Sequence, residues 1–438
     1  MSKLSGFPEY LPAERHVELA LLDHLRSTFE LHGFANIETR AVETMDTLTR
    51  KGDINKEVYV IKRVHAEAGE DSGMGLHFDL TVPFARYVVE NAGQLAFPFR
   101  RYQIQKVWRG ERPQQGRFRE FVQADIDIVG DGALPFHADV EVARVMAEAL
   151  AGAPLGDIEF VLQVSNRKVL EGFYLGLGIS DPTAVMQIVD KLDKLSAEKI
   201  HELLAEAGLS PVQAQSCLAL AEICTTDSSF VDQVRALGVE HEMLDEGLSE
   251  LAAVVNGCAG IAGVTVTADL RIARGLDYYT GTVFETRMVG YESLGSVCSG
   301  GRYDQLATSG KRTYPGVGIS LGVSRLLAPL FAAGLTTDRA VPSVVYIAVD
   351  DEVSRANSTA IAQKLRSRGV PCEVAAQASK FGKQIRAAER RGIPYVWFPA
   401  SNEVKDIRSG DQVEADPDSW LPAENDLRPQ VIVKETDA

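Results

Sequence analysis

Four arginines and two glutamates gather within residues 107–121, VWRGERPQQGRFREF, in a chain whose formal net charge is −16. The arginines are Arg109, Arg112, Arg117 and Arg119, and the glutamates are Glu111 and Glu120. Guanidinium groups form bidentate, charge-assisted hydrogen bonds with phosphoryl and carboxylate oxygens, so the segment has the chemistry of an anion site. A solvated hairpin that carries charge for solubility is the plainer alternative.

The segments 101–109 and 119–129 are predicted to be two strands joined by the connection ERPQQGRFR. Because alternate side chains of a strand share a face, the second strand has one apolar face that belongs to a core. The opposite face carries Arg117, Arg119, Phe121, Gln123, Asp125 and Asp127. Arginines, a ring, an amide and two carboxylates are more than a merely wet sheet surface requires, which favours a functional site.

Three further stretches carry residues suited to binding, namely HFDLTVPF at 77–84, RGLDYYTGTVFE at 274–285 and CSGGRYDQL at 298–306. A glycine-rich stretch, GVGISLGVSRL at 316–326, has neither the dinucleotide spacing G-x-G-x-x-G nor the spacing of a Walker loop. We therefore expect any nucleotide phosphates to be held by side chains.

The apolar spacing predicts the elements that position these residues. An amphipathic helix is expected over 14–31, and a short strand is expected to lead into a helix opened by Pro83. Further along we expect a helix over 136–152, a strand over 157–164, helices through most of 166–256 and strands over about 264–287. Strands interrupted in this way predict a helical insertion inside a mostly antiparallel β domain.

The last part of the chain is predicted to form a separate domain. The stretch FAAGLTTDRAVPS suggests a linker over 331–341, and strands and helices alternate beyond it. The expected organisation is a first domain over 1–330, with its insertion at about 166–256, and a small α/β domain over 342–438.

Composition limits the class of protein. The 438 residues are 45% hydrophobic and 24% charged, which is ordinary globular composition and enough for two or three cores. No apolar run approaches the roughly 20 residues of a membrane-spanning helix, so we expect a cytosolic protein without membrane contact. The five cysteines are scattered without a C-x-x-C pair, which indicates neither a disulfide framework nor a zinc site.

Nucleic-acid contact in so acidic a chain requires a local basic patch. Residues 355–391 contain nine basic residues against Glu373 and Glu389. The basic residues are Arg355, Lys364, Arg366, Arg368, Lys380, Lys383, Arg386, Arg390 and Arg391. Two helices with solvated faces explain the patch as well as an RNA surface does, and the sequence leaves both open.

Together these stretches resemble a known family. The hairpin with its GRFREF return is similar to motif 2 of class II aminoacyl-tRNA synthetases, and GVGISLGVSRL is similar to their motif 3. The stretches RGLDYYTGTVFE and SGGRYDQL resemble the two histidine-pocket signatures of the histidyl-tRNA synthetase family, and KFGKQIRAAERRGIPY resembles its anticodon-binding domain. The resemblance implies an α+β fold, in which helices flank a class II antiparallel sheet with a helical insertion, followed by a C-terminal α/β anticodon-binding domain.

The resemblance also implies roles for particular residues. Catalytic roles would fall to Arg109, Arg274 and Arg325. ATP would be bound by Arg109, Glu111, Arg117, Phe121 and Arg325. Histidine would be bound by Asp79, Leu80, Thr81, Arg109, Gln123, Asp127, Arg274, Tyr278 and Tyr279. No protein ligand for a metal ion is assigned.

Each residue has a plainer interpretation when it is taken alone. Arg325 would form a surface salt bridge, Tyr278 and Tyr279 would be an aromatic pair in a strand, and Asp79 would begin a turn. The joint occurrence of four long signatures, in order, outweighs these interpretations. One departure concerns motif 1, because Arg40 and Ala41 stand where class II enzymes normally place a proline after the strand.

The resemblance implies a histidine–tRNA ligase that forms histidyl-adenylate from L-histidine, ATP and Mg²⁺ and transfers histidine to the 3′ end of tRNA(His). It also implies a homodimer. The main rival is a regulatory paralogue that senses histidine for an ATP phosphoribosyltransferase, although such paralogues typically lack the anticodon-binding domain and lose the ATP arginines. A generic RNA-binding scaffold is the third possibility, supported only by the patch at 355–391.

Overall fold

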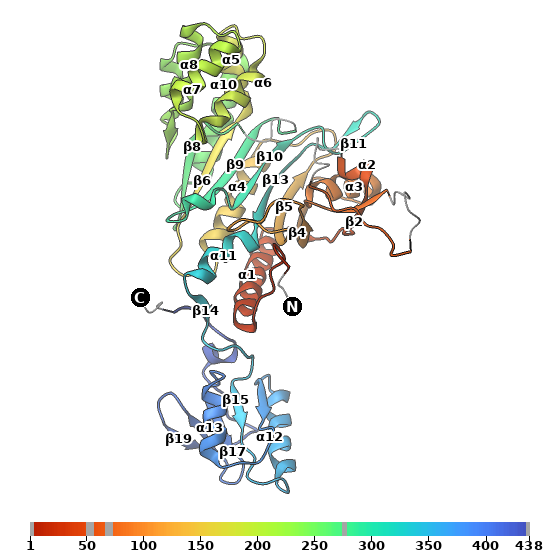
Figure 1. Cartoon of the computed structure of the whole chain (residues 1–438), viewed down its shortest axis with the longest axis vertical. Coiled ribbons are helices and arrows are strands. Elements are labelled where there is room, and N and C mark those ends of the chain that lie inside the picture. The colour runs from red at the N-terminus through yellow and green to blue at the C-terminus, as the bar shows by residue number, and fades with distance from the viewer. Residues whose placement is uncertain (1–3, 50–56, 66–72, 274–277, 435–438) are drawn as a thin grey trace. The chain divides into compact units, whose positions relative to one another are not determined.

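The computed structural model describes residues 4–49, 57–65, 73–273 and 278–434. The chain divides into two compact units, drawn in Figure 1. The first unit contains Met1–Pro8, Leu22–Ala153 and Asp157–Pro329, and the second contains Glu9–Leu21, Pro154–Gly156 and Leu330–Ala438.

A mixed sheet forms the centre of the first unit, with the strand order β1-β4-β5-β13-β10-β9-β6-β8-β7 within the described residues. In that order the strands are Ala35–Asn36, Phe99–Trp108, Glu120–Val129, Gly316–Gly322, Cys298–Tyr303, Thr282–Met288, Phe160–Asn166, Val264–Asp269 and Cys224–Thr225. The pairs β1–β4 and β6–β8 are parallel, and the other neighbours are antiparallel. The α+β fold with a largely antiparallel sheet is therefore confirmed.

Helices cover one face of this sheet. Helix α4 (His137–Ala151) packs against β13, β5, β6 and β8, and nine of its side chains are buried. The apolar residues of β5 that were predicted to face a core, Val122, Ala124, Ile126 and Ile128, are all buried. Helix α1 (Pro12–Leu31) confirms the helix predicted over 14–31, and the centre of its Phe29 ring lies 5.8 Å from that of the Tyr102 ring of β4. Helix α11 (Val323–Ala332) directly follows β13.

The helical run between β6 and β8 begins and ends beside the sheet, as Figure 1 shows. Its elements are α5 (Arg167–Gly176), α6 (Pro182–Val189), η2 (Asp190–Asp193), α7 (Ala197–Glu206), α8 (Pro211–Ala221), α9 (Phe230–Ala236) and α10 (Glu242–Gly257). Side chains of Asp181, Ser196 and Ser210 cap the N-termini of α6, α7 and α8. The short strand β7 was not predicted within this run.

Small elements complete the first unit. They are β2 (Val42–Thr44), α2 (Met45–Leu48), β3 (Met74–Leu76), α3 (Thr81–Asn91), η3 (Glu292–Leu294), β11 (Thr308–Ser309) and β12 (Arg312–Thr313). Helix α3 begins two residues before Pro83, so the predicted strand-to-helix passage is present with a slightly earlier start.

The second unit contains a sheet of order β16-β15-β17-β18-β19 and two helices. Its elements are β15 (Val345–Ile347), α12 (Arg355–Ser367), β16 (Cys372–Val374), α13 (Phe381–Glu389), β17 (Tyr395–Phe398), β18 (Glu403–Asp406), β19 (Gln412–Glu414) and η4 (Glu424–Leu427). The predicted α/β alternation is confirmed. One strand within the stretch predicted as a linker, β14 (Leu335–Thr337), pairs with β20 (Val431–Val433).

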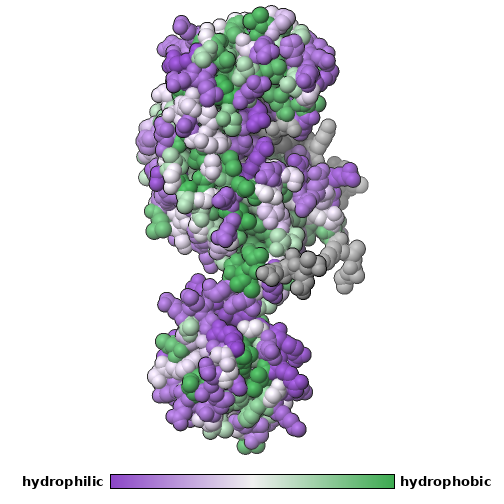
Figure 2. All heavy atoms as spheres, turned by 90° about the vertical axis from the view of Figure 1, so that its left-hand side faces the viewer, coloured by the Kyte–Doolittle hydropathy of each residue, from purple (hydrophilic) through white to green (hydrophobic). Residues whose placement is uncertain are grey.

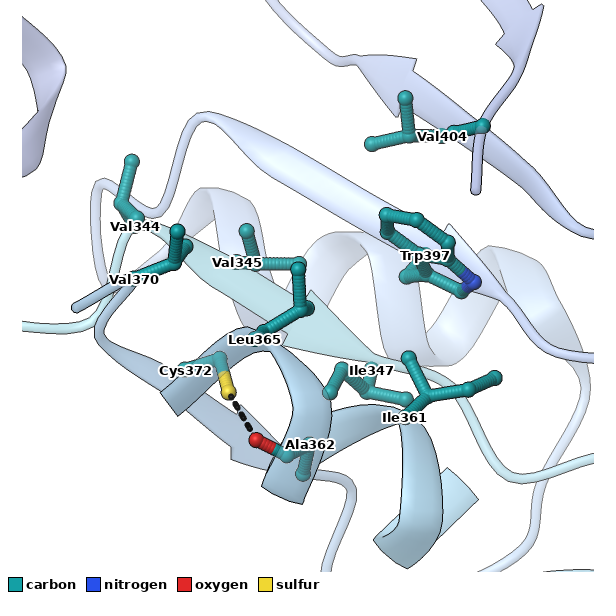
Figure 3. Packing of buried hydrophobic residues seen from close by; sticks show 11 residues of the cluster. Val344, Val345, Ile347, Ile361, Ala362, Leu365, Val370, Cys372, Trp397 and Val404 are labelled. Atoms are coloured by element: carbon teal, nitrogen blue, oxygen red, sulfur yellow. Dashed lines mark hydrogen bonds between the residues drawn. The ribbon is translucent and has the colours of Figure 1, made fainter. Parts of the chain in front are cut away.

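The core of the second unit is apolar and closely packed. Figure 3 shows Trp397 and Val404 with aliphatic side chains of β15 and α12, and Trp397 is fully buried. Figure 2 shows hydrophilic and hydrophobic side chains intermingled over the face of each unit that it presents. Among the described helices, none has the length and apolar character needed to cross a membrane.

Candidate active site

The arginine-rich hairpin is formed by β4 and β5, as predicted. Val107 lies opposite Phe121, and Gln105 lies opposite Gln123, so the odd-numbered residues of both strands share one face. The Arg109 backbone N–H donates a 2.9 Å hydrogen bond to the Arg119 carbonyl, which extends the ladder to the start of the turn. The alternation seen in the sequence therefore places one polar face on two paired strands.

Arginines converge on a cavity of about 210 Å³ beside this hairpin. Its lining includes every residue predicted to bind ATP, namely Arg109, Glu111, Arg117, Phe121 and Arg325. We call it the arginine cavity. Its other lining residues are Gly116, Phe118, Gln123, Ser296, Val297, Ser299, Ser320 and Gly322.

Three guanidinium groups and one carboxylate dominate the electrostatics of the arginine cavity. Arg117 Nη1 lies 3.4 Å from Glu111 Oε2, and the Arg109 guanidinium carbon lies 5.1 Å from the centre of the Phe121 ring. Burial lowers the pKa of Arg325, and the neighbouring positive charge of Arg117 lowers it further. Like charges held close together in this way favour an anion with several negative charges.

A second, narrow cavity of about 20 Å³ adjoins it, with room for about one water molecule. We call it the tyrosine cavity. Its lining residues are Thr81, Asp125, Asp127, Tyr278, Tyr279, Ser299, Gly300, Gly301, Tyr303, Gly318, Ile319 and Ser320. Four residues predicted to bind histidine, Thr81, Asp127, Tyr278 and Tyr279, therefore meet here.

Asp127 is the most enclosed carboxylate predicted in the site, with 3% of its surface exposed. Tyr303 Oη donates a 2.7 Å hydrogen bond to Asp127 Oδ1. Burial raises the pKa of Tyr303 and of Tyr279, and nearby negative charge, including that of Asp127, raises both further. Both phenols therefore keep their protons at neutral pH and can act as hydrogen-bond donors.

The other residues predicted to bind histidine do not all line one cavity. Asp79 Oδ1 accepts a 3.0 Å hydrogen bond from the Val82 N–H, so Asp79 does support the start of α3. Gln123 lines the arginine cavity and donates a hydrogen bond to Ser320 Oγ. Leu80 is fully buried and lines neither cavity. Arg274 lies outside the described residues.

The segment 77–84 is held against the hairpin by Arg109. Its Nε donates a 2.9 Å hydrogen bond to the Phe78 carbonyl, so the same guanidinium lines the arginine cavity and fixes the stretch that carries Asp79 and Thr81. Arg119 Nε instead donates to the Glu111 carbonyl at 3.1 Å, which gives that arginine a role in shaping the turn.

The glycines of the two glycine-rich stretches lie in strands β10 and β13, beneath the tyrosine cavity. A Cβ atom on Gly318 would lie 2.1 Å from Asp127 Oδ1, and one on Gly301 would lie 2.9 Å from the Tyr279 ring. Side chains at these positions would displace the carboxylate or the ring. The glycines thus provide room for Asp127 and Tyr279, which explains why their spacing matches no phosphate loop.

Some residues of the site were not assigned from the sequence. Tyr303 contacts Asp127 across 176 positions of sequence, and Ser320 lines both cavities. Tyr303 lies in the stretch CSGGRYDQL, and Asp125 lies on the polar face of β5, but neither had a stated role. Arg101 is odd-numbered, like Gln103 and Gln105, so the alternation along the strand could have placed it on the same face as the predicted site.

A third cavity, of about 590 Å³, opens beside the first two and shares Arg117, Arg325, Tyr278 and Tyr279 with them. It extends to η3 and to Lys194, at the end of η2. A substrate larger than a nucleotide could therefore reach the arginine cavity from the side of the helical insertion.

The basic patch of the second unit is narrower than the sequence suggests. Arg355, Lys364 and Arg391 pair with Glu352, Asp418 and Glu373, respectively. Arg366 and Arg368 donate hydrogen bonds to backbone carbonyls such as those of Cys372 and Trp420. Within the described part of the chain, Lys380, Lys383 and Arg390 form no such pair, so the basic surface is concentrated on α13 and its C-terminal end.

Comparison with known proteins gives a consistent picture. A family model described as histidyl-tRNA synthetase matches residues 6–326, and one described as an anticodon binding domain matches 343–414. The chain is 58% identical to a histidine–tRNA ligase of Cutibacterium acnes over 99% of both chains. It is 56% identical to a histidine–tRNA ligase of Micrococcus luteus over 98% of both chains.

Solved structures agree. The crystal structure of histidyl-tRNA synthetase from Nostoc sp. has a TM-score of 0.84 and 35% identity, covering 95% of this chain and 97% of that one. A structure from Bacillus halodurans named as an ATP phosphoribosyltransferase regulatory subunit/histidyl-tRNA synthetase has a TM-score of 0.72 at 21% identity, covering 88% of this chain and 96% of that one. That second likeness concerns the fold alone.

Proposed function

This chain belongs to the histidyl-tRNA synthetase family and is a histidine–tRNA ligase, and from that premise we propose how its two cavities carry out the reaction. Histidine and ATP form histidyl-adenylate and pyrophosphate, and the histidyl group then passes to the 3′ end of tRNA(His) with release of AMP. The observation that carries this proposal is the convergence of Arg109, Arg117 and Arg325 on one cavity beside a second cavity lined by Asp127 and Tyr279.

ATP occupies the arginine cavity in this proposal. Arg109 holds the α-phosphate and the amino-acid carboxylate, and Arg325 holds the distal phosphates. Arg117 and Glu111 support the nucleotide, and Phe121 offers a ring against which adenine stacks. The support for these roles is that all five residues line the same cavity. One face of the Phe121 ring already lies near the Arg109 guanidinium, so adenine takes the other face.

Histidine occupies the tyrosine cavity, with its imidazole toward Asp127 and Tyr279. Asp79, Thr81 and Gln123 receive the α-ammonium group, with Leu80 buried between the first two, and Tyr278 lies beside the imidazole. Arg274 is assigned to the charge that develops at the reacting groups. The cavity measures about 20 Å³, which is too small for histidine. Histidine binding therefore requires the rings of Tyr278 and Tyr279, whose centres lie 4.2 Å apart, to move.

The chemistry needs positioning and fixed charge. A carboxylate oxygen of histidine attacks the α-phosphorus in line, a new O–P bond forms, and the bond to pyrophosphate breaks with its electron pair on the departing oxygen. A carboxylate is already a nucleophile, so no side chain has to remove a proton. Arginines that remain charged throughout stabilise the growing negative charge without reorganisation.

Mg²⁺ enters with ATP as part of the substrate. Among the described residues there is no cluster of three or more His, Cys, Asp or Glu side chains suited to a metal ion. This fits Mg²⁺, which is commonly bound through one or two carboxylates plus substrate phosphates. Glu111 lines the arginine cavity, and Glu285 lines the third cavity, which shares Arg325 with it, so these two carboxylates are the candidates.

The partners and location follow from the family. We propose that tRNA(His) contacts the basic surface of α13 in the second unit, that the enzyme acts as a homodimer, and that it works in the cytoplasm. The rival regulatory subunit shares the fold at 21% identity. Two features favour the ligase over that rival. All three ATP arginines, Arg109, Arg117 and Arg325, line one cavity, and the anticodon-binding match spans 343–414.

Charging of tRNA tests the proposed function. The purified full chain is incubated with ATP, Mg²⁺, labelled histidine and a tRNA(His) transcript, and acid-precipitable label is counted. We expect label that depends on ATP and on the intact 3′ end of the tRNA. Histidine binding by calorimetry without charging of tRNA would instead support the regulatory subunit.

A further inference from the structure

A fully buried arginine lies directly behind the tyrosine cavity. Arg101 on β4 is the register partner of Asp127 on β5, and its side chain has no exposed surface. Arg101 Nη2 lies 2.7 Å from Asp127 Oδ2 and 3.9 Å from Asp125 Oδ2. On its other side, the guanidinium carbon lies 4.2 Å from the centre of the Phe84 ring of α3. Arg101 therefore joins the two carboxylates of β5 without lining the cavity itself.

The contacts of Arg101 are unlike those of a structural arginine. Its three nitrogens are buried without a directed hydrogen bond in the described part of the protein, so the contact with Asp127 is an ion pair by distance only. The same chain offers a contrast in Arg302, which bonds to Asp139 Oδ2 at 2.6 Å and 3.1 Å and to the Leu134 carbonyl at 3.2 Å. Arg302 is a satisfied structural arginine, and Arg101 is not.

A buried charge with incomplete hydrogen bonding is a poor source of stability. Asp125 Oδ1 is also buried without a hydrogen-bond partner among the described residues. Burial raises the pKa of Asp125 to about 7, while the positive charge of Arg101 opposes that rise and the negative charge of Asp127 adds to it. The guanidinium therefore faces two carboxylates that both line the tyrosine cavity, and it lies nearer to Asp127.

Three contacts together fix the plane of the Asp127 carboxylate. Tyr303 donates to Oδ1, Arg101 lies against Oδ2, and Gly318 leaves no more than the space that Oδ1 fills. Each carboxylate oxygen has two lone pairs, so the contacts with Tyr303 and Arg101 alone do not use up the hydrogen-bond acceptor capacity of Asp127. Its direction is set partly by Arg101, which does not line the cavity, and this matters for a group that must meet an imidazole N–H.

We propose that Arg101 is a positioning residue for histidine recognition, whose buried guanidinium aims the Asp127 carboxylate at the imidazole and holds it apart from Asp125. The role deepens the proposed function and rests on the assignment of the tyrosine cavity to histidine. The guanidinium acts through Asp127 and makes no contact with substrate. Recognition of the imidazole thus depends on Arg101, which pairs with Asp127 from behind the cavity, as well as on the residues that line the cavity.

The test compares four variants with the native enzyme by ATP–pyrophosphate exchange. Arg101→Met keeps a long side chain and removes the charge, and Arg101→Lys restores a charge. The double variant Arg101→Met with Asp125→Asn removes one positive and one negative charge, so it keeps the balance of the cluster without the guanidinium. The matched control is Arg100→Met, because Arg100 is the neighbour on the same strand and pairs with Glu141 of α4 instead.

We expect Arg101→Met and the double variant to raise the histidine KM at least about tenfold, with the ATP KM changed no more than about twofold. Arg101→Lys should recover part of the loss, and Arg100→Met should leave the histidine KM unchanged. If Arg101→Met does not fold, the double variant and Arg101→Lys decide the question. A double variant with the native histidine KM would overturn the proposal, since Arg101 would then serve charge balance alone. Equal rises in both KM values would overturn it as well.

Calorimetric titration of histidine into the same proteins separates this proposal from the proposed function. If the native chain binds histidine but gives no exchange, the ligase mechanism fails while the variants still rank by histidine affinity. If the native chain binds histidine and the Arg101→Met variant binds it equally well, the positioning role fails and the ligase mechanism stands.

Discussion

Replacing Gly318 with alanine tests the packing beneath the proposed histidine pocket. The added Cβ would lie 2.1 Å from Asp127 Oδ1 and 2.8 Å from the Ile126 carbonyl oxygen, where ordinary contacts begin at 3.4 Å. The carboxylate must therefore retreat by more than 1 Å, from 2.1 Å to at least 3.4 Å. A hydrogen bond to a charged group contributes about 1.5–3 kcal/mol, so its loss should raise the histidine KM about 10- to 150-fold.

The assay is ATP–pyrophosphate exchange with each substrate varied in turn, alongside urea unfolding. The Gly318→Ala enzyme should keep its ATP KM within about twofold, and overpacking should cost about 1–3 kcal/mol of unfolding free energy. Gly93→Ala is the control, because its Cβ would meet no atom within 4 Å and Gly93 lines neither cavity. A folded Gly318→Ala enzyme with the native histidine KM would refute the placement of the imidazole beside Asp127.

Three other substitutions test separate parts of the site. Arg109→Ala should slow adenylation about 10²- to 10³-fold, because the arginine meets charge that builds in the transition state, and unchanged turnover would remove it from the mechanism. Asp127→Ala should raise the histidine KM far more than the ATP KM, whereas equal rises would indicate general disruption. Burial raises the Asp125 pKa to about 7 from 3.8, so the folded state takes up a proton below pH 7 and stability falls as the pH rises from about 4 to 7. Asn does not ionise, so the Asp125→Asn enzyme avoids that loss. Its unfolding free energy in urea, relative to that of the native chain, should be about 3 kcal/mol higher at pH 8 than at pH 5. The same difference at both pH values would contradict the buried ionisation.

The hairpin of the site was predictable because its signal is local. Alternation along β5 and the charged turn determine which residues share a face, and the observed pairing of Gln105 with Gln123 follows from it. Helix α1 was predictable for a similar reason, since its apolar stripe repeats at helical spacing.

Contacts between distant segments were not predictable from local pattern. Tyr303 meets Asp127 across 176 positions, and the glycines of β10 and β13 gain their purpose only once the strands pair. The sequence could also not show that Arg366 and Arg368 donate to backbone carbonyls, because those carbonyls come together only in the folded second unit. A count of basic residues therefore overstated the surface open to RNA.

Short strands without an apolar pattern were missed for a physical reason. Strand β7 has two residues and pairs with β8, and β14 has three residues and pairs with β20 almost a hundred positions later. Such strands are determined by the partner edge that they join rather than by their own composition. The predicted linker at 331–341 contains β14 for this reason.

The most direct test of the account is amino-acid-dependent ATP–pyrophosphate exchange by the purified chain with Mg²⁺ and without tRNA. Histidine is compared with each of the other nineteen amino acids. The comparison separates adenylation, which is assigned to the arginine cavity, from selection of the imidazole, which is assigned to the tyrosine cavity. Exchange with histidine alone is the predicted result. Exchange with several amino acids, or none with histidine while calorimetry still detects its binding, would contradict the account.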